Sequence, residues 1–217
     1  MKKHSKRKIV VVSAGEDISR KKLLEYCRNA DLIISADAGL NVLDKLKIKP
    51  SIIIGDMDSA NEKLLKKFKD VQKELFPTNK DLTDSELALK KALLFDPEII
   101  SIFGATGSYF DHSYANVINL FKYHKKNAEI EIITSNARIF SIVREKEILN
   151  HKNRRFSLFV IEEVHGLEMH GSKYEFKSNK KLSPAEYSIS NVIINNDFKI
   201  KFKKGLMFCV LFDEGYK

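Results

Sequence analysis

Short, uninterrupted aliphatic runs alternate with amphipathic segments over the first two thirds of the chain. Runs such as residues 9–12 and 52–54 lack the polar alternation of a strand with one wet face, so they predict strands buried on both faces. The predicted strands lie at residues 8–13, 32–35, 51–54, 73–76, 99–103 and 129–134, with helices near 18–30, 40–46, 61–69, 84–95 and 112–125. This repeated order predicts an α/β domain over residues 1–137, built on a doubly wound, mostly parallel sheet.

The pattern changes after residue 137, where the chain shows no long helical stretch. Short strands are predicted at residues 156–161, 167–169, 173–176, 186–194, 198–203 and 207–212, separated by turn-forming pairs such as His165-Gly166. Residues 198–203 alternate strictly between apolar and basic side chains, as a half-exposed antiparallel strand does. Residues 138–217 are therefore predicted to form a second, smaller all-β domain, a sandwich or a partial barrel.

Composition excludes several classes of protein. The chain is 43% hydrophobic, yet its longest aliphatic runs are far too short to cross a bilayer. The apolar block at residues 9–12 is also shorter than the ~7–15 residues of a secretory signal. Cys27 and Cys209 have no metal-type or redox-type spacing. We expect a cytoplasmic protein that binds no membrane, and neither a disulfide scaffold nor a zinc module.

The positive charge has a local source. The chain has 38 Lys and Arg against 29 Asp and Glu, a net charge of +9, and five of these charges are the basic residues at positions 2, 3, 6, 7 and 8. A solvated, frayed terminus explains this stretch better than an arm for nucleic acid, so we expect no nucleic-acid partner. A nucleic-acid-binding protein is the alternative from a different class, and strongly salt-dependent binding would identify it.

Aspartates gather where the predicted strands end, and this is the strongest functional signal in the sequence. The carboxyl ends of parallel strands open onto one edge of a sheet, where ligands bind. Acids packed there without a counter-ion would repel one another, and a divalent cation such as Mg²⁺, with substrate phosphates, would relieve the repulsion. The positions are Asp37, Asp56, Asp58, Asp81, Asp84 and Asp111. The sequence therefore predicts a metal–phosphate site at this edge.

Helix capping is the alternative explanation for any one of these aspartates, since each precedes a predicted helix. Thr83 and Glu86 supply a separate capping-box signal for the helix near residues 84–95. Capping does not explain why so many acids share one edge, with two of them in the segment Gly55-Asp56-Met57-Asp58-Ser59. We therefore favour the metal–phosphate site.

A glycine-containing loop, Gly104-Ala105-Thr106-Gly107-Ser108, connects a predicted strand end to the next helix. Glycines let backbone N–H groups approach phosphate oxygens, and a helix N-terminus favours negative charge. The chain contains neither a P-loop nor a dinucleotide-binding fingerprint. Lys80 is a further candidate for meeting a phosphate charge.

Five segments in series resemble the signature segments of thiamine pyrophosphokinases, in the right order over nearly the whole chain. They are Asp37-Ala38-Gly39, Gly55-Asp56-Met57-Asp58-Ser59, Lys80-Asp81-Leu82-Thr83-Asp84, Gly104-Ala105-Thr106-Gly107-Ser108-Tyr109-Phe110-Asp111-His112 and Ser190-Asn191. Gly166-Leu167, Gly171 and Tyr174 precede the last segment in the pattern of that family.

The resemblance implies an α/β domain followed by a β-sandwich domain, and a homodimer with its sites near the domain and subunit junction. It implies Mg²⁺-dependent transfer of the pyrophosphoryl group of ATP to the hydroxyethyl oxygen of thiamine, giving thiamine diphosphate and AMP. Residues 1–137 would then bind ATP and Mg²⁺ and carry catalysis, and residues 138–217 would bind thiamine.

The resemblance also implies roles for individual residues. The acids around Mg²⁺ and the ATP phosphates would be Asp37, Asp56, Asp58 and Asp84. Asp37, Lys80, Asp81, Thr83, Thr106 and Gly107 would line the nucleotide, while Asp111, Ser190 and Asn191 would lie on the thiamine side. Asp56, Asp58, Asp84 and Asp111 are the expected catalytic residues, with Asp111, and after it Asp84, as candidates for the base that accepts the alcohol proton.

The chain departs from the family pattern at two places, and the first of them keeps a second enzymatic function open. Ser108-Tyr109 stands where the family usually has Gly-Arg, so a guanidinium that could bind phosphate in a bidentate manner is missing. Met57 replaces the more usual aromatic residue, a milder change. The chain has no Trp, so Tyr187 is the candidate for stacking on thiamine. The alternative is a pyrophosphokinase of the same fold that acts on another hydroxyalkyl heterocycle, such as a hydroxymethylpterin.

Overall fold

The computed structural model describes residues 7–56, 62–77, 79, 81–107, 109–124, 128–176 and 180–215. The chain divides into two compact units, Met1–Ser135 and Asn136–Lys217, which we call unit 1 and unit 2. Both cysteines are free thiols. Among the described helices, none combines the length and the apolar character that crossing a membrane requires.

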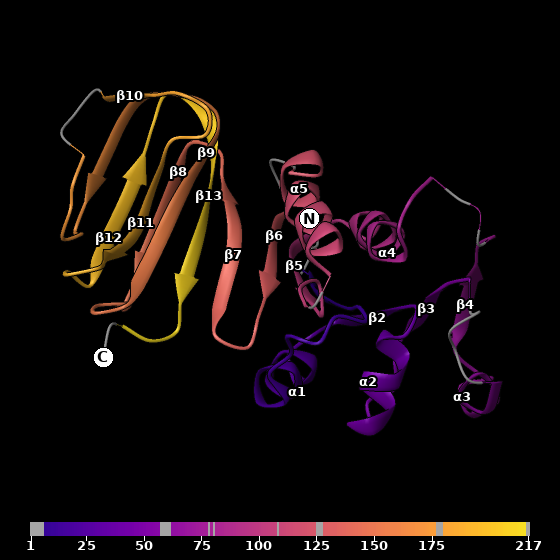
Figure 1. Ribbon diagram of the computed structural model, residues 1–217. Coiled ribbons are helices and arrows are strands. Elements are labelled where there is room, and N and C mark those ends of the chain that lie inside the picture. Colours follow the sequence, from indigo (N-terminus) through magenta and orange to yellow (C-terminus); the bar gives the residue numbers. More distant parts are fainter. Residues whose placement is uncertain are drawn as a thin grey trace, which may run out of the picture. The chain divides into compact units, whose positions relative to one another are not determined.

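Unit 1 is built on six parallel strands in the order β4-β3-β2-β1-β5-β6 (Figure 1). They are β1 (Arg7–Val12), β2 (Leu32–Ala36), β3 (Ile52–Gly55), β4 (Gln72–Leu75), β5 (Pro97–Phe103) and β6 (Glu129–Ile133). β1, β3 and the ends of β2 and β5 are buried without polar alternation, because helices cover both faces of the sheet. The predicted doubly wound, parallel sheet is confirmed.

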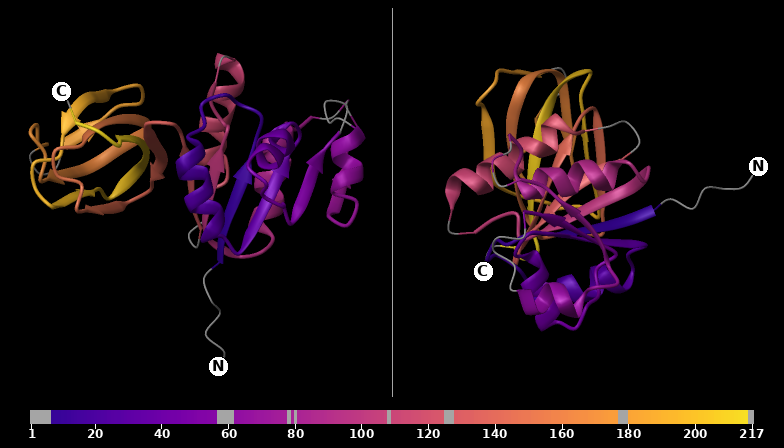
Figure 2. Two further views of the ribbon diagram at one scale, coloured as in Figure 1. Left: turned by 90° about the horizontal axis from the view of Figure 1, so that it is seen from below. Right: turned by 90° about the vertical axis from the view of Figure 1, so that its right-hand side faces the viewer.

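Five helices cover the two faces of this sheet. They are α1 (Arg20–Arg28), α2 (Gly39–Lys45), α3 (Glu62–Lys67), α4 (Asp84–Leu93) and α5 (Phe110–Lys122). α1, α2 and α3 lie on one face, and α4 and α5 lie on the other (Figures 1 and 2). On the first face Leu23 and Leu43 pack against Val10 and Val12. On the second, α4 packs across β1, β2 and β3. The strand ends between these layers are left open at the edge.

Unit 2 is entirely antiparallel, as predicted, and consists of two sheets that share one long strand. Its strands are β7 (Ala137–Ile142), β8 (Glu145–Leu149), β9 (Arg155–His170), β10 (Lys180–Leu182), β11 (Tyr187–Val192), β12 (Asp197–Lys201) and β13 (Lys204–Phe212). The start of β9 pairs with β11 and β13, and its end pairs with β12. The two sheets enclose one apolar core, in which the rings of Phe156 and Phe198 lie 4.6 Å apart.

Two of the strand predictions for unit 2 are wrong, and one hairpin was missed. His165-Gly166 does not end a strand, because β9 continues through it, paired with β13 up to His165 and with β12 from Glu168 onward, and Gly166 has φ +67°. Residues 173–176 form no strand. The hairpin of β7 and β8 was not predicted, because β8 is charged and mostly exposed and therefore carries little apolar signal.

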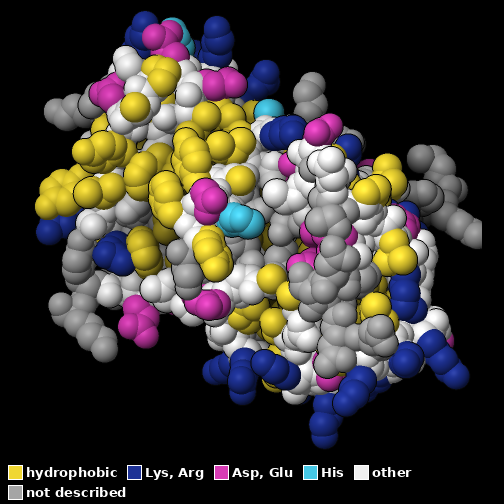
Figure 3. Space-filling view, turned by 45° about the vertical axis from the view of Figure 1, so that its right-hand side comes forward, with side chains coloured by type: hydrophobic (Ala, Val, Ile, Leu, Met, Phe, Trp, Pro, Cys, Tyr) yellow, Lys and Arg dark blue, Asp and Glu magenta, His cyan; other side chains and the backbone are white. Residues whose placement is uncertain are grey.

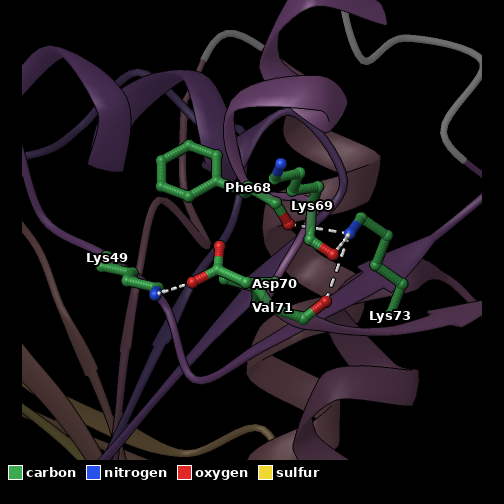
Figure 4. A network of polar contacts seen from close by, with 6 residues as sticks. All are labelled: Lys49, Phe68, Lys69, Asp70, Val71 and Lys73. Carbon is green, nitrogen blue, oxygen red and sulfur yellow. Dashed lines mark hydrogen bonds and ion pairs between the residues drawn. The ribbon is translucent and has the colours of Figure 1, made fainter.

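The turn after α3 is held by one lysine. The ammonium group of Lys73, on β4, donates hydrogen bonds to the carbonyl oxygens of Phe68 (2.7 Å), Lys69 (3.3 Å) and Val71 (3.2 Å) (Figure 4). Asp70, between them, pairs with Lys49 on the preceding loop. A cation among carbonyl groups that follow a helix is favourable, because those groups carry the negative end of the helix dipole.

Lys73→Met is expected to lower the free energy of unfolding by about 1–2 kcal/mol, because Met keeps the apolar stem but removes one donor from each of three carbonyl groups, of which Phe68 O keeps its bond from Val71 N–H. The measurement is the urea midpoint. Lys69→Met is the matched control, since Lys69 is exposed and contributes only its backbone carbonyl to the network. Equal midpoints for the two variants would contradict the role given to Lys73.

Candidate functional site

The carboxyl ends of the parallel strands in unit 1 are joined by backbone hydrogen bonds that extend just past the sheet. Ser13 N–H donates to Phe103 O (2.8 Å), which joins the ends of β1 and β5. Asp37 N–H donates to Ile54 O (2.8 Å), and Phe76 N–H donates to Gly55 O (3.1 Å). The segments that follow β1 to β5 therefore start from one continuous edge.

Asp37 and Asp56 come from neighbouring positions on this edge. Asp37 has φ +43°, a left-handed conformation that aspartate tolerates better than most residues, and its Oδ1 is shielded from solvent. Gly55, directly before Asp56, has φ +150°, and a Cβ atom at this position would lie 3.2 Å from Cα of Asp37. The missing side chain at Gly55 lets the two strand ends approach, so that Asp56 follows beside Asp37.

Asp84 reaches the same edge because α4 begins there. Thr83 is the N-cap, and its hydroxyl accepts the Glu86 N–H (3.2 Å), which confirms this half of the predicted capping box. Ser85 Oγ donates to Ser13 Oγ (2.8 Å), which ties the first turn of α4 to the end of β1. Asp84 is thus placed at the strand ends, while Asp81 is exposed on the segment before it.

The side chain of Glu86 does not close the capping box. It accepts hydrogen bonds from Lys122 Nζ (2.6 Å) and Tyr123 Oη (2.5 Å), both at the end of α5. Burial on its own would raise the pKa of Glu86, but the hydrogen bonds from Lys122 and Tyr123 outweigh it and hold the pKa below the usual 4.5. Glu86 therefore joins the start of α4, with Asp84, to α5.

Glu86→Gln is expected to lower the free energy of unfolding by about 1–3 kcal/mol at pH 7, because a buried charge-assisted cluster is broken. The pKa of Glu86 is lowered in the folded protein, so its stabilisation is present above pH 4.5 and is lost as the pH falls below that value. The difference between variant and wild type should therefore shrink in acid. Urea unfolding at pH 7 and at acidic pH measures this. Glu25→Gln, on an exposed position of α1, is the control, and a pH-independent difference for Glu86→Gln would contradict the assignment.

The glycine-containing loop after β5 packs backbone against backbone on the loop after β1. Gly15 N–H donates to Gly104 O (2.8 Å), and a Cβ atom on Gly15 would lie 2.4 Å from Thr106 O. Gly104 has φ +66°, and its Cβ would lie 2.3 Å from Ser13 O. Only glycine fits these positions. Gly107 N–H donates to Ser113 Oγ (3.2 Å), so this amide already has an acceptor within the protein.

Asp111 lies in the first turn of α5, which begins at Phe110, earlier than predicted. Its side chain is exposed, and Oδ1 accepts the N–H of His112 (2.9 Å). The N-caps of α2, α4 and α5 are Ala38, Thr83 and Tyr109. Capping, the alternative explanation for the aspartates, therefore does not account for Asp37, Asp84 or Asp111.

Two predicted site residues, Asp58 and Lys80, lie outside the described residues. Within the described part of the chain, no three His, Cys, Asp or Glu side chains are arranged to hold a metal ion. The donors that the edge does bring to neighbouring strand ends, Asp37 and Asp56, are carboxylates, and hard oxygen donors of this kind fit Mg²⁺.

The two predicted residues of unit 2 follow each other on β11. Asn191 is fully buried; its side chain accepts the Tyr174 N–H (3.1 Å) and donates to the Tyr174 O (2.8 Å). It therefore fixes the segment that carries Tyr174. Ser190 has φ +60° at a bulge, and its N–H donates to Ser157 Oγ (3.1 Å). Tyr187 exposes 65% of its surface.

Sequence reasoning missed the contribution of the loop after β1. Ser13 and Gly15 contact the start of α4 and the loop after β5, and Asp17 bonds to Thr106. The signal was a glycine and an acid just beyond a predicted strand end, the same pattern that singled out the other segments.

Comparison with known proteins gives consistent matches. A family model described as "Thiamin pyrophosphokinase, catalytic domain" matches residues 23–132. The chain is 30% identical over 207 residues to a thiamine pyrophosphokinase of Bacillus subtilis (strain 168), an alignment that covers 93% of this chain and 97% of the relative.

Solved structures match over the same extent. The crystal structure of thiamine pyrophosphokinase from Bacillus subtilis has a TM-score of 0.82 at 29% identity, and covers 94% of this chain and 98% of its own. That of thiamin pyrophosphokinase from Geobacillus thermodenitrificans has a TM-score of 0.82 at 24% identity, covering 95% and 98%, and supports the fold.

Proposed function

Because the chain belongs to the thiamine pyrophosphokinase family, we propose that it transfers the pyrophosphoryl group of ATP to thiamine, giving thiamine diphosphate and AMP. The observation that carries the proposal is the edge of unit 1, where Asp37 and Asp56 lie at neighbouring strand ends beside a loop of backbone-packed glycines. Acids next to a phosphate-type loop suit an enzyme that handles a metal-bound nucleotide. We propose a cytoplasmic location, because the reaction consumes ATP.

Asp37, Asp56, Asp58 and Asp84 would hold Mg²⁺ in this proposal. Bound with the ATP phosphates, the ion would neutralise the charge of the transferred group. Thr83 and Thr106 would supply hydroxyl groups, and Gly107 would line the nucleotide with its backbone. Lys80 and Asp81 belong to the segment between β4 and α4 and would complete the nucleotide site.

The reaction forms a bond between the thiamine oxygen and the β-phosphorus and breaks the bond from that phosphorus to the oxygen bridging to the α-phosphate. The alcohol proton must pass to a base, and Asp111 is our first candidate because its carboxylate is exposed on the first turn of α5. Asp84 is the second. We propose that Ser190 contacts thiamine directly and that the buried Asn191 acts by holding Tyr174 in place.

We also propose that the protein is a homodimer. Apolar side chains gather on one face of unit 2 (Figure 3). Tyr187 and Ile189, alternate residues of β11, are 65% and 58% exposed, and the ring of Phe159 contacts the rings of both Tyr187 and Phe208. An exposed apolar face of this kind suits a second copy of the chain. Light scattering during size-exclusion chromatography would give the mass, and a monomer at micromolar concentration would contradict the dimer.

The deciding experiment is a product assay with purified protein, MgATP and thiamine. We expect AMP and thiamine diphosphate in equal amounts, and loss of both on chelation of Mg²⁺. Formation of ADP and thiamine monophosphate would overturn pyrophosphoryl transfer. A product from a hydroxymethylpterin, but none from thiamine, would mean that the acceptor is not thiamine. It would point to Ser108-Tyr109 as the altered part of the site.

A further inference from the structure

One carboxylate links three of the loops at the edge of unit 1. Asp17 lies after β1, and its Oδ2 accepts the hydroxyl of Thr106 (3.2 Å), which lies after β5. Its Oδ1 accepts the N–H of Ser135 (2.9 Å), which lies after β6. β1, β5 and β6 are neighbours in the sheet, so Asp17 spans the ends of three adjacent strands with one side chain.

The backbone around Asp17 reinforces the link to Thr106. Asp17 N–H donates to Thr106 O (3.3 Å), two residues beyond the bond from Gly15 N–H to Gly104 O. Thr106 is therefore held to Asp17 both through its carbonyl oxygen and through its hydroxyl. A Cβ atom on Gly107 would lie 2.9 Å from Glu16 N, so the next residue of the loop also rests on this segment.

We propose that Asp17 is a positioning residue for the nucleotide, a role that rests on the proposed function. Asp17 orients the hydroxyl of Thr106 and fixes the position of residues 104–107 relative to the strand ends. Without this side chain the loop would keep its backbone bonds at Ser13, Gly15 and Asp17, but the hydroxyl of Thr106 and the N–H of Ser135 would lose their acceptor. A small displacement of groups that bind a substrate weakens binding strongly, so the effect falls on nucleotide affinity.

The contacts of Asp17 separate this role from a general contribution to stability. Asp17 is only half-buried, and the side-chain bonds described for it go to edge loops and to none of the core residues. Asp31 offers a matched comparison. It also accepts a backbone N–H with its carboxylate, that of Lys8 (2.7 Å), but at the opposite edge of the same sheet, where β1 begins.

The test compares Asp17→Ala, Asp17→Asn and Asp31→Ala. In Asp17→Ala we expect KM for MgATP and the Kd of MgATP to rise about tenfold, with kcat within about threefold of wild type, because both bonds to the carboxylate, from Thr106 and from Ser135, are lost. Asp17→Asn should restore both values, since its amide oxygen accepts the Ser135 N–H and its NH₂ group donates to Thr106. Asp31→Ala should match wild type. Asp17→Ser, which is too short to reach Thr106, repeats the test if Asp17→Ala does not fold.

Hydrogen–deuterium exchange gives a readout that does not depend on the acceptor. Amides of residues 104–107 and 135 should exchange faster in Asp17→Ala and should not in Asp17→Asn. Unchanged exchange, an unchanged Kd for MgATP, or an Asn variant as weak as the Ala variant would each overturn the proposal. Wild-type protein that binds MgATP but makes no thiamine diphosphate would refute the proposed function alone, because the Kd series still decides the role of Asp17. Failure of the wild type to bind MgATP would overturn both.

Discussion

Asp56→Asn is expected to lower kcat/KM for MgATP by about a thousandfold while unit 1 keeps its fold. Removing one group that stabilises transition-state charge typically costs a factor of about 100 to 1,000, and loss of a metal-binding carboxylate adds a requirement for more Mg²⁺. Asp56 follows the buried end of β3 and is only half-buried itself, so the isosteric amide should not disturb packing. Steady-state kinetics over a range of Mg²⁺ concentrations, with thermal unfolding as the test of fold, measures the effect.

The matched control is Asp31→Asn, which removes an exposed carboxylate at the opposite edge of the same sheet and should leave turnover unchanged. Asp58→Asn is expected to behave as Asp56→Asn does. Near-normal turnover of Asp56→Asn at ordinary Mg²⁺ concentration would remove Asp56 from the metal site and with it the central observation behind the proposed function.

Gly39→Ala has the largest expected effect on folding. Gly39 opens α2, and a Cβ atom there would lie 2.0 Å from Val12 O and 2.7 Å from Val12 C, both in the backbone of the central strand β1. Neither the strand nor the helix can move away without disturbing its own packing. The free energy of unfolding should therefore fall by about 3 kcal/mol or more, the upper end of the range for an overpacked site. For a unit of this size that corresponds to a fall in Tm of roughly 10 °C.

Activity should fall with stability in this variant, because α2 begins two residues after Asp37 and cannot shift without moving it. Ala14→Ser is the control, an exposed position on the same edge where an added hydroxyl meets solvent. A Tm for Gly39→Ala within about 2 °C of wild type would mean that α2 moves easily on β1, contrary to the close contact between their backbones.

The sequence predicted the parallel sheet and the place of the acids, because both depend on local patterns. Aliphatic runs identify the strands, and a parallel sheet necessarily brings the residues just after Ala36, Gly55 and Phe103 to one edge. Contacts between distant segments carried no such signal. The bonds of Asp17 to Thr106 and Ser135 span 89 and 118 residues, and they exist only once the order of β1, β5 and β6 is set.

Two further differences have the same origin. Glu86 was expected to complete its own capping box, but Lys122 and Tyr123 on another helix compete for its carboxylate more strongly. Gly166 was expected to end a strand, but β9 continues through it, paired with β13 up to His165 and with β12 from Glu168 onward. In both cases local preference was overridden by a partner that is remote in sequence.

The backbone-to-backbone packing of the strand-end loops has a consequence for how the chain can vary. Gly15, Gly104 and Gly107 form a strip along the edge in which Gly104 is buried, Gly15 is half-buried and Gly107 is exposed, and a methyl group on any of them would collide with main-chain atoms. A saturation mutagenesis screen should therefore find this strip of surface as intolerant as the hydrophobic interior, in contrast to the lysine-rich outer faces of the helices. Here the permitted substitutions are set by steric exclusion and not by burial.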